Sequence, residues 1–84
     1  MHKLIKYNNK VYNIHIITLP VSFSIKISCK NAYCIVIYIP HENKNFTYNI
    51  VSAEGKLQTE EIEGVLQIFT NNLFDMYKHL LKGN

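Results

Sequence analysis

The sequence predicts an α+β fold: a five-stranded antiparallel β-meander, open or curled, with one long C-terminal α-helix packed on one face. Two patterns predict this fold class. Apolar and polar residues alternate through most of residues 4–52, which is typical of strands with one buried face. From residue 60 onward, apolar residues recur every three or four positions, which is typical of an amphipathic helix. A chain of residues 1–84 is long enough for a single domain.

The first two strands are expected at residues 4–7 and 11–18, joined by a turn that contains Asn8 and Asn9. Asparagine tolerates the left-handed backbone conformation that tight turns require. Pairing across this turn places the apolar residues of both strands on one face of the sheet. Those residues are Ile5, Tyr7, Tyr12, Ile14 and Ile16.

The third strand is expected at residues 21–29, after Pro20, which cannot donate a hydrogen bond to a β-ladder. Alternate residues from Phe23 to Ile27 are apolar and are expected to face the helix. We expect Ile16 to pair with Phe23, because this register aligns the apolar faces of the two strands.

The fourth strand, residues 33–39, is apolar on both faces. A three-residue loop at residues 30–32 would pair Cys29 with Tyr33 and so decide which apolar row faces the helix. In that register the inward row is Tyr33, Ile35, Ile37 and Ile39, and the outward row is Cys34, Val36 and Tyr38.

The fifth strand is expected at residues 46–52, and its inward residues are Phe46, Tyr48 and Ile50. A turn around Gly55 leads from this strand to the helix. The sequence thus predicts five strands before the spacing of apolar residues changes from that of a strand to that of a helix.

The helix is expected at residues 60–82, with Thr59 as its N-cap. Gly64 lies inside it, where glycine costs about 1 kcal/mol relative to alanine. We therefore expect the sheet to approach the helix backbone closely at this position. The expected apolar stripe is Ile62, Val65, Leu66, Phe69, Leu73, Met76, Tyr77 and Leu80, widened by Phe74 and Leu81.

Catalytic and metal-binding roles are not expected. The predicted register directs Cys29 and Cys34 to opposite faces of the sheet, although a four-residue loop would place them opposite each other. His15 and Cys34 would share the outer face about 10 Å apart, beyond hydrogen-bond reach. The glutamates of residues 60–63 suit the first turn of a helix. We expect a protein that is not an enzyme, with two reduced cysteines, no metal site and no cofactor.

The uncovered face of the sheet is the expected site of protein contact. Nothing in the chain is expected to cover it, and the helix carries more apolar surface than one small sheet requires. Such surfaces are typical of sites that a partner or a second copy covers. The expected partner-binding or dimer residues are Cys34, Val36, Tyr38, Val51, Ile68, Phe74 and Leu81.

Two alternative roles follow from the same sheet. One is binding of single-stranded nucleic acid or a nucleotide, since lysines can hold phosphates, although the absence of arginine disfavours sequence-specific recognition. The other is a structural obligate homodimer, formed by stacked sheets or by pairing of the fifth strand. The residues expected to bind nucleic acid are Lys6, His15, Lys26 and Tyr38.

The composition carries a hint about origin. Isoleucine, asparagine, lysine and tyrosine are abundant, which is typical of AT-rich genomes. No secretory signal or membrane span is visible, so a cytoplasmic location is expected, in the host cell if the source is viral. The leading hypothesis is a small intracellular module that binds another protein. Its size and composition favour an inhibitor encoded by a phage or mobile element, such as an anti-CRISPR or other anti-defence factor.

Overall fold

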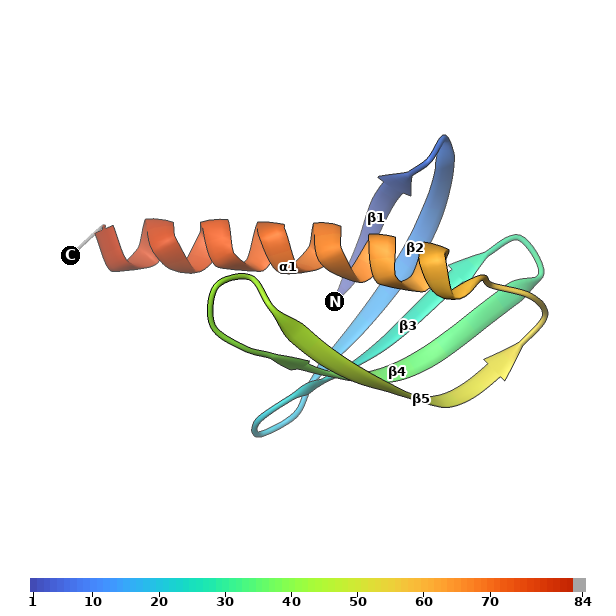
Figure 1. Ribbon diagram of the computed structural model, residues 1–84, viewed down its shortest axis with the longest axis horizontal. Helices are drawn as coiled ribbons and strands as arrows, with labels where there is room; N and C mark the ends of the chain where they lie inside the picture. The colour runs from blue at the N-terminus through green and yellow to red at the C-terminus, as the bar shows by residue number, and fades with distance from the viewer. Residues whose placement is uncertain (83–84) are drawn as a thin grey trace.

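The computed structural model describes the backbone of residues 1–82 and the side chains of residues 1–75. Within that part of the chain, five strands form one open sheet in sequence order, with every neighbouring pair antiparallel, and one helix follows (Figure 1). The predicted α+β fold is therefore confirmed. The elements are β1 (His2–Tyr7), β2 (Lys10–Thr18), β3 (Phe23–Cys29), β4 (Ala32–Pro40), β5 (Phe46–Glu54) and α1 (Thr59–Lys82).

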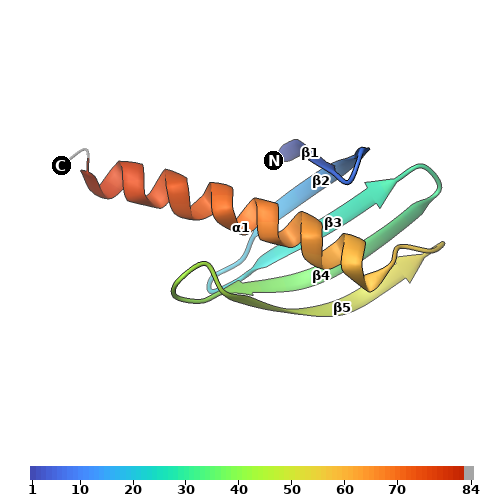
Figure 2. The same cartoon turned by 45° about the horizontal axis from the view of Figure 1, so that its top comes forward.

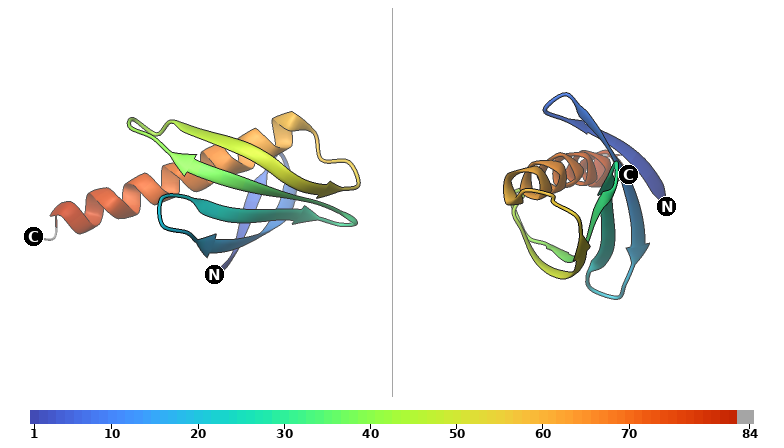
Figure 3. Two further views of the ribbon diagram at one scale, coloured as in Figure 1. Left: turned by 90° about the horizontal axis from the view of Figure 1, so that it is seen from below. Right: turned by 90° about the vertical axis from the view of Figure 1, so that its right-hand side faces the viewer.

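Helix α1 lies across one face of the sheet, and the sheet curls around the first half of the helix (Figures 2 and 3). The second half of α1 projects beyond the strands (Figure 1). The left panel of Figure 3 views the molecule of Figure 1 from below, with α1 behind the sheet, and no other element lies in front of the sheet there. The described chain thus covers one face of the sheet and leaves the other, here called the outer face, uncovered.

The hydrophobic core lies between the sheet and the first half of α1. Thr70 is fully buried within it, and its hydroxyl donates to the Leu66 carbonyl at 2.7 Å. The Tyr38 hydroxyl lies 2.6 Å from Thr70 Oγ1 and must donate to it, because threonine has only one hydroxyl proton. The buried apolar residues are Ile5, Tyr12, Ile14, Ile16, Ile25, Ile27, Cys34, Val36, Tyr38, Ile62, Val65, Leu66 and Phe69.

The predicted register of β4 is wrong by one residue. Cys29 pairs with Ala32, so a two-residue turn, Lys30 and Asn31, replaces the predicted three-residue loop. Lys30 has a φ of 56°, the left-handed conformation that short hairpin turns use. A one-residue change moves every side chain of a strand to the opposite face. The row that faces α1 is Cys34, Val36 and Tyr38, and the outward row is Tyr33, Ile35, Ile37 and Ile39.

Burial of apolar area cannot choose between these two rows, because both are apolar. Turn length and the aromatic packing of Tyr38 distinguish them. The Tyr38 ring stacks on Phe46 with centroids 5.5 Å apart and meets Phe69 edge-on at 5.2 Å. Such pairs contribute about 0.5–1.5 kcal/mol beyond their buried area. The observed register therefore places Tyr38 where it has aromatic neighbours.

The register between β2 and β3 also differs from the prediction, but by two residues. Ile16 pairs with Ile25, and Thr18 pairs with Phe23. A shift of two residues keeps each side chain on its predicted face. The inward residues of both strands are accordingly buried or half-buried, as expected.

Strand β5 contains a β-bulge opposite the middle of β4. Val36 pairs with Ile50 and Ile35 pairs with Ser52, which leaves Val51 without a partner. Phe46 and Tyr48 are half-buried on the helix side, as predicted. Ile50 lies on the same side of the sheet but is 52% exposed, so the prediction that it joins the core is wrong.

The helix begins one residue earlier than expected. The Gln58 carbonyl accepts the first helical bond, from the Ile62 amide, at 3.1 Å. Gln58, rather than Thr59, therefore occupies the N-cap position. The Glu61 carboxylate accepts the Gln58 amide proton at 2.9 Å, which satisfies a donor that helix geometry leaves unpaired.

The helix stripe is confirmed over its described half. Ile62, Val65, Leu66 and Phe69 are buried. Leu73 packs against the core half-buried, and so does Ile68, which the periodicity placed outside the stripe. The expected stripe residues Met76, Tyr77 and Leu80 lie outside the described side chains.

The expected close approach at Gly64 is present. A side chain at this position would overlap the ring of Tyr7 from β1, so glycine makes the space that the ring occupies. The Tyr7 hydroxyl donates a hydrogen bond to the Glu60 carboxylate of α1 at 3.4 Å.

Candidate interaction surface

The outer face of the sheet carries a continuous apolar row along β4. The residues of this β4 outer row, all half-buried, are Tyr33, Ile35, Ile37 and Ile39. They have neighbouring strands on both sides but no described element above them (Figure 3). A strand buried on one face only would normally carry polar residues here. The row is therefore the most apolar part of the uncovered sheet.

Exposed apolar residues extend this row toward its neighbours. Ile37 pairs with Ser24, which pairs in turn with Ile17, and Ile17 is 53% exposed. Leu4 on β1 is also exposed. The apolar character thus spreads from β4 across the sheet.

The structure overturns three of the residues predicted for this surface. Cys34, Val36 and Tyr38 are at most 1% exposed and lie beneath α1, because the register of β4 differs by one residue. The residues that take their place are those of the β4 outer row. The expectation of an apolar strip on the outer face of the fourth strand survives, since both rows of that strand are apolar.

The other residues predicted for this surface do not form one patch. Val51 is exposed on β5, whereas Ile68 packs half-buried against the core. Phe74 lines a separate groove at the far end of the sheet. Leu81 lies outside the described side chains. Among the described residues of this group, only Val51 is an exposed residue of the sheet.

The groove lined by Phe74 has a volume of about 880 Å³. It lies between α1, the β2–β3 loop and the β4–β5 loop, and most of its lining is apolar, including Leu73, Phe23 and Val21. On the helix side it is lined by Leu73, Phe74 and Asp75. This apolar groove is separate from the outer face.

Three of the four residues predicted to bind nucleic acid lie on the same face of the sheet. Lys6, His15 and Lys26 lie on the outer face, but Tyr38 does not, because it is in the core. Tyr33 replaces it: the Lys26 Nζ atom lies 4.7 Å from the centre of the Tyr33 ring. A prediction of a two-residue turn at residues 30–31 would have placed Tyr33 on the outer face.

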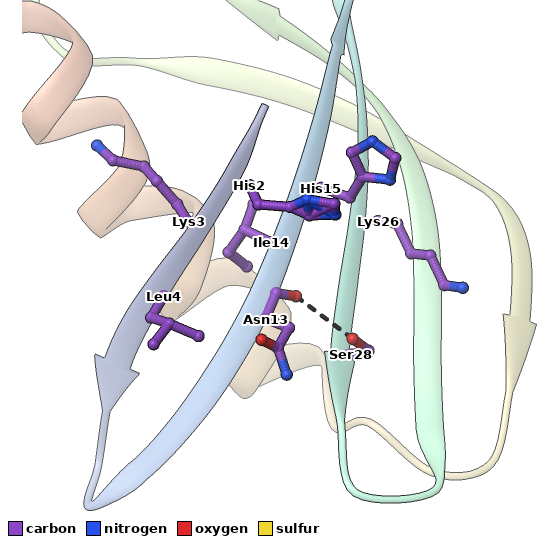
Figure 4. A pocket seen from close by; sticks show the side chains of 8 residues that line it. All are labelled: His2, Lys3, Leu4, Asn13, Ile14, His15, Lys26 and Ser28. Atoms are coloured by element: carbon purple, nitrogen blue, oxygen red, sulfur yellow. Dashed lines mark hydrogen bonds between the residues drawn. The ribbon is translucent and has the colours of Figure 1, made fainter.

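A polar hollow of about 380 Å³ lies on the outer face over the first three strands (Figure 4). His2 and His15 pair across β1 and β2, and their rings stack with centroids 4.3 Å apart. Lys26 is the neighbour of His15 on β3. The other lining residues are Lys3, Leu4, Asn13, Ile14 and Ser28, so none of the described carboxylates borders the hollow.

The carboxylates gather instead at the start of α1, on the covered side. Glu61 accepts hydrogen bonds from the Tyr12 hydroxyl at 2.8 Å and from the Lys10 ammonium at 3.0 Å. Together with the Gln58 amide, these donors lower the pKa of the Glu61 carboxyl. Burial and Glu63, which accepts the hydroxyl proton of Tyr48 at 2.8 Å, raise the pKa of Tyr48 to about 12. These contacts bind the helix to the sheet and present no unpaired acid or base.

The cysteines do not form a nucleophilic site. Both face α1, which corrects the prediction of opposite faces, and both thiols are free. Burial raises the pKa of the Cys34 thiol, which disfavours the reactive thiolate. His15 lies on the other side of the sheet from Cys34, so the two cannot act together. Among the described residues, no three side chains of His, Cys, Asp or Glu are grouped closely enough to bind a metal ion.

No family model, no curated protein and no solved structure shows significant similarity to this chain. In the part of the chain that the structure describes, no helix has the length and hydrophobicity needed to cross a membrane.

Proposed function

We propose that this protein is a small non-enzymatic module that binds another protein through the outer face of its sheet. The observation that carries this proposal is the uncovered β4 outer row, centred on Ile35 and Ile37. A small monomeric protein gains stability by burying its apolar residues. The fold of this chain needs only one apolar row of β4 for its core, so the second apolar row is not explained by the fold. A partner that covers the row explains why both faces are apolar.

The surroundings of the row also fit a protein partner. Its flanks carry polar and basic side chains, including Lys26 and Asn49, while the centre is apolar. Protein interfaces commonly have an apolar centre and a polar rim. Within this role, inhibition of a host defence system, encoded by a phage or mobile element, is the proposal that size and AT-rich composition support.

The test is a comparison of single substitutions on and off the outer face. Ile37→Asp on β4 and Ile17→Asp on β2 are each expected to weaken partner binding by at least about tenfold. In both variants a charge buried in the interface would replace an apolar contact. Val21→Asp is the matched control, because Val21 is 83% exposed in the loop between β2 and β3. Binding is measured by affinity capture with quantitative mass spectrometry.

The partner must be captured by the wild type and by Val21→Asp, and lost with both outer-face variants. Circular dichroism and urea unfolding confirm that each variant is folded. A partner captured equally by all four proteins would disprove the role of the outer face.

Single-stranded nucleic acid is the second candidate, favoured by the placement of Lys26 over Tyr33 beside the stacked histidines. Aromatic rings and lysines on an open sheet can stack bases and hold phosphates. With two or three phosphate contacts, affinity is expected to fall about 7- to 20-fold between 50 and 200 mM salt. Fluorescence anisotropy with an oligonucleotide measures this, and Tyr33→Ala with Lys26→Ala should abolish it. Binding that is absent at low salt removes this candidate.

A further inference from the structure

The polar hollow over the first three strands is lined by groups that donate hydrogen bonds (Figure 4). His2 of β1 pairs with His15 of β2, and Lys26 of β3 continues the same row across the sheet. Asn13 and Ser28 pair in the next row that faces outward. Imidazole, ammonium, amide and hydroxyl groups can all donate to an oxyanion. The lining therefore has the chemistry of an anion-binding site.

Negative charge is scarce on this side of the molecule. Glu54 is the one acidic residue among the residues of the five strands. Tyr33 of β4 lies between Glu54 and Ser28 in the paired row, so Glu54 is separated from the hollow. The glutamates of residues 60–63 lie at the start of α1, where they accept hydrogen bonds from tyrosines on the covered side. This distribution favours an anion over a metal cation in the hollow.

The remaining charged groups near the two histidines are also cationic. Lys3 follows His2 in sequence but points away from the histidine rings (Figure 4), and Lys6 lies further along the outer side of β1. The Met1 amino group donates to the Ile16 carbonyl at 3.0 Å. Helix α1 lies on the opposite face of the sheet (Figure 2). Protonated histidines here therefore have no described carboxylate to balance their charge.

The His2 and His15 rings are in contact, with centroids 4.3 Å apart and an angle of 17° between their planes. Two protonated rings at this separation repel each other. An anion placed against both rings offsets that repulsion, so its binding favours the protonated pair. Histidine ordinarily changes charge between about pH 5 and 8. Anion binding beside this pair is therefore coupled to proton uptake and strengthens as pH falls through that range.

We propose that the hollow over β1, β2 and β3 binds a small tetrahedral oxyanion of the phosphate or sulfate class, and that protonation of His2 and His15 strengthens this binding. Lys26 lines the hollow and supplies a fixed positive charge on a flexible side chain. The volume of about 380 Å³ accommodates such an ion together with water. The protein contact proposed above centres on β4, so the inference does not rest on that function.

The test is an NMR titration of the protein with sodium sulfate, followed through the backbone amide shifts. Ionic strength is held constant, because salt screens charge. Sulfate is doubly charged throughout the range used, so a change of affinity with pH reports on the protein. The association constant for sulfate is expected to rise at least about fivefold from about pH 7.5 to about pH 5.5. The largest shifts are expected on β1, β2 and β3.

Glutamine variants separate the histidine pair from the fixed charge. His2→Gln combined with His15→Gln should reduce the rise between the two pH values to less than about twofold, since no imidazole remains to take up a proton. His41→Gln, in the exposed turn between β4 and β5, is the matched control and should keep the full rise. Lys26→Gln is expected to lower the affinity at least about threefold at both pH values and to leave the rise unchanged.

Absence of sulfate binding at both pH values overturns the inference, and so does an affinity that does not vary with pH. A full rise in the double histidine variant also overturns it. The amide spectra themselves show whether each variant is folded. A thymidine oligonucleotide identifies the source of the anion. A tighter affinity with the same histidine-dependent rise assigns it to a nucleic-acid backbone, whereas a rise that only sulfate shows assigns it to a free oxyanion.

Discussion

Individual side chains explain how the helix is fixed to the sheet. Gly64 provides the space into which the Tyr7 ring packs, and Thr70 provides the acceptor for the buried Tyr38 hydroxyl. Both are residues that an isolated helix would disfavour, since glycine and threonine have low helix propensity. Their presence in α1 is explained by contacts to strands that are distant in sequence.

Gly64→Ala is expected to destabilise the protein by about 1–2 kcal/mol, although alanine favours an isolated helix by about 1 kcal/mol. The added methyl group overlaps the Tyr7 ring, which must leave its site and lose its contact with Glu60. Urea unfolding of the single and double variants measures the effect. In a Tyr7→Ala background the sign should reverse, so that Gly64→Ala becomes stabilising. Destabilisation of equal size in both backgrounds would contradict this explanation.

At the scale of single elements, β4 is the strand whose placement matters most for function. Its two apolar rows have similar hydrophobicity, and its register decides which row is the core and which is the candidate surface. The two-residue turn at Lys30 and Asn31 selects the row that contains Tyr38 for the core. The same turn leaves Tyr33 beside Lys26 on the outer face.

Matched substitutions at Tyr33 and Tyr38 test this register. Tyr38→Asp places an unpaired charge in the core and is expected to unfold the protein, with a loss of more than about 4 kcal/mol. Tyr33→Asp lies on the outer face and should leave the protein folded, with a loss below about 1.5 kcal/mol. Circular dichroism and thermal unfolding distinguish the outcomes. The opposite result would support the register in which Tyr33 faces the helix.

At the scale of the whole molecule, polar contacts between the first hairpin and the start of α1 add to the hydrophobic core that joins sheet and helix. Glu61 accepts hydrogen bonds from Lys10 and Tyr12 of β2 and from the Gln58 amide at the start of the helix, and so links the sheet to α1. The core lies behind these contacts, while the second half of α1 projects away from it (Figure 1). Loss of the Glu61 charge is therefore expected to weaken the packing of the helix on the sheet.

This contact makes stability dependent on pH. Because the pKa of Glu61 is lower in the folded protein than its ordinary value of 4.5, the ionised carboxylate stabilises the fold above pH 4.5. That contribution is lost as pH falls through the folded-state pKa. Glu61→Gln should be less stable than the wild type near neutral pH, and the difference should shrink progressively below pH 4.5. Urea unfolding across this range measures it, and a difference that does not vary with pH would refute the role of the charge.

The sequence by itself determined the fold class, the order of the strands, the helix and its described apolar face, and the presence of an apolar strip on the outer face of the fourth strand. These features follow from the local periodicity of apolar residues. That periodicity does not depend on how neighbouring strands pair, so an error in register leaves these predictions intact. Tertiary structure alone decided the identity of the candidate surface, because one residue of turn length exchanges Tyr38 for Tyr33. Two apolar rows on one strand give burial no means of choosing between them, so the choice fell to the turn and to the aromatic neighbours of Tyr38.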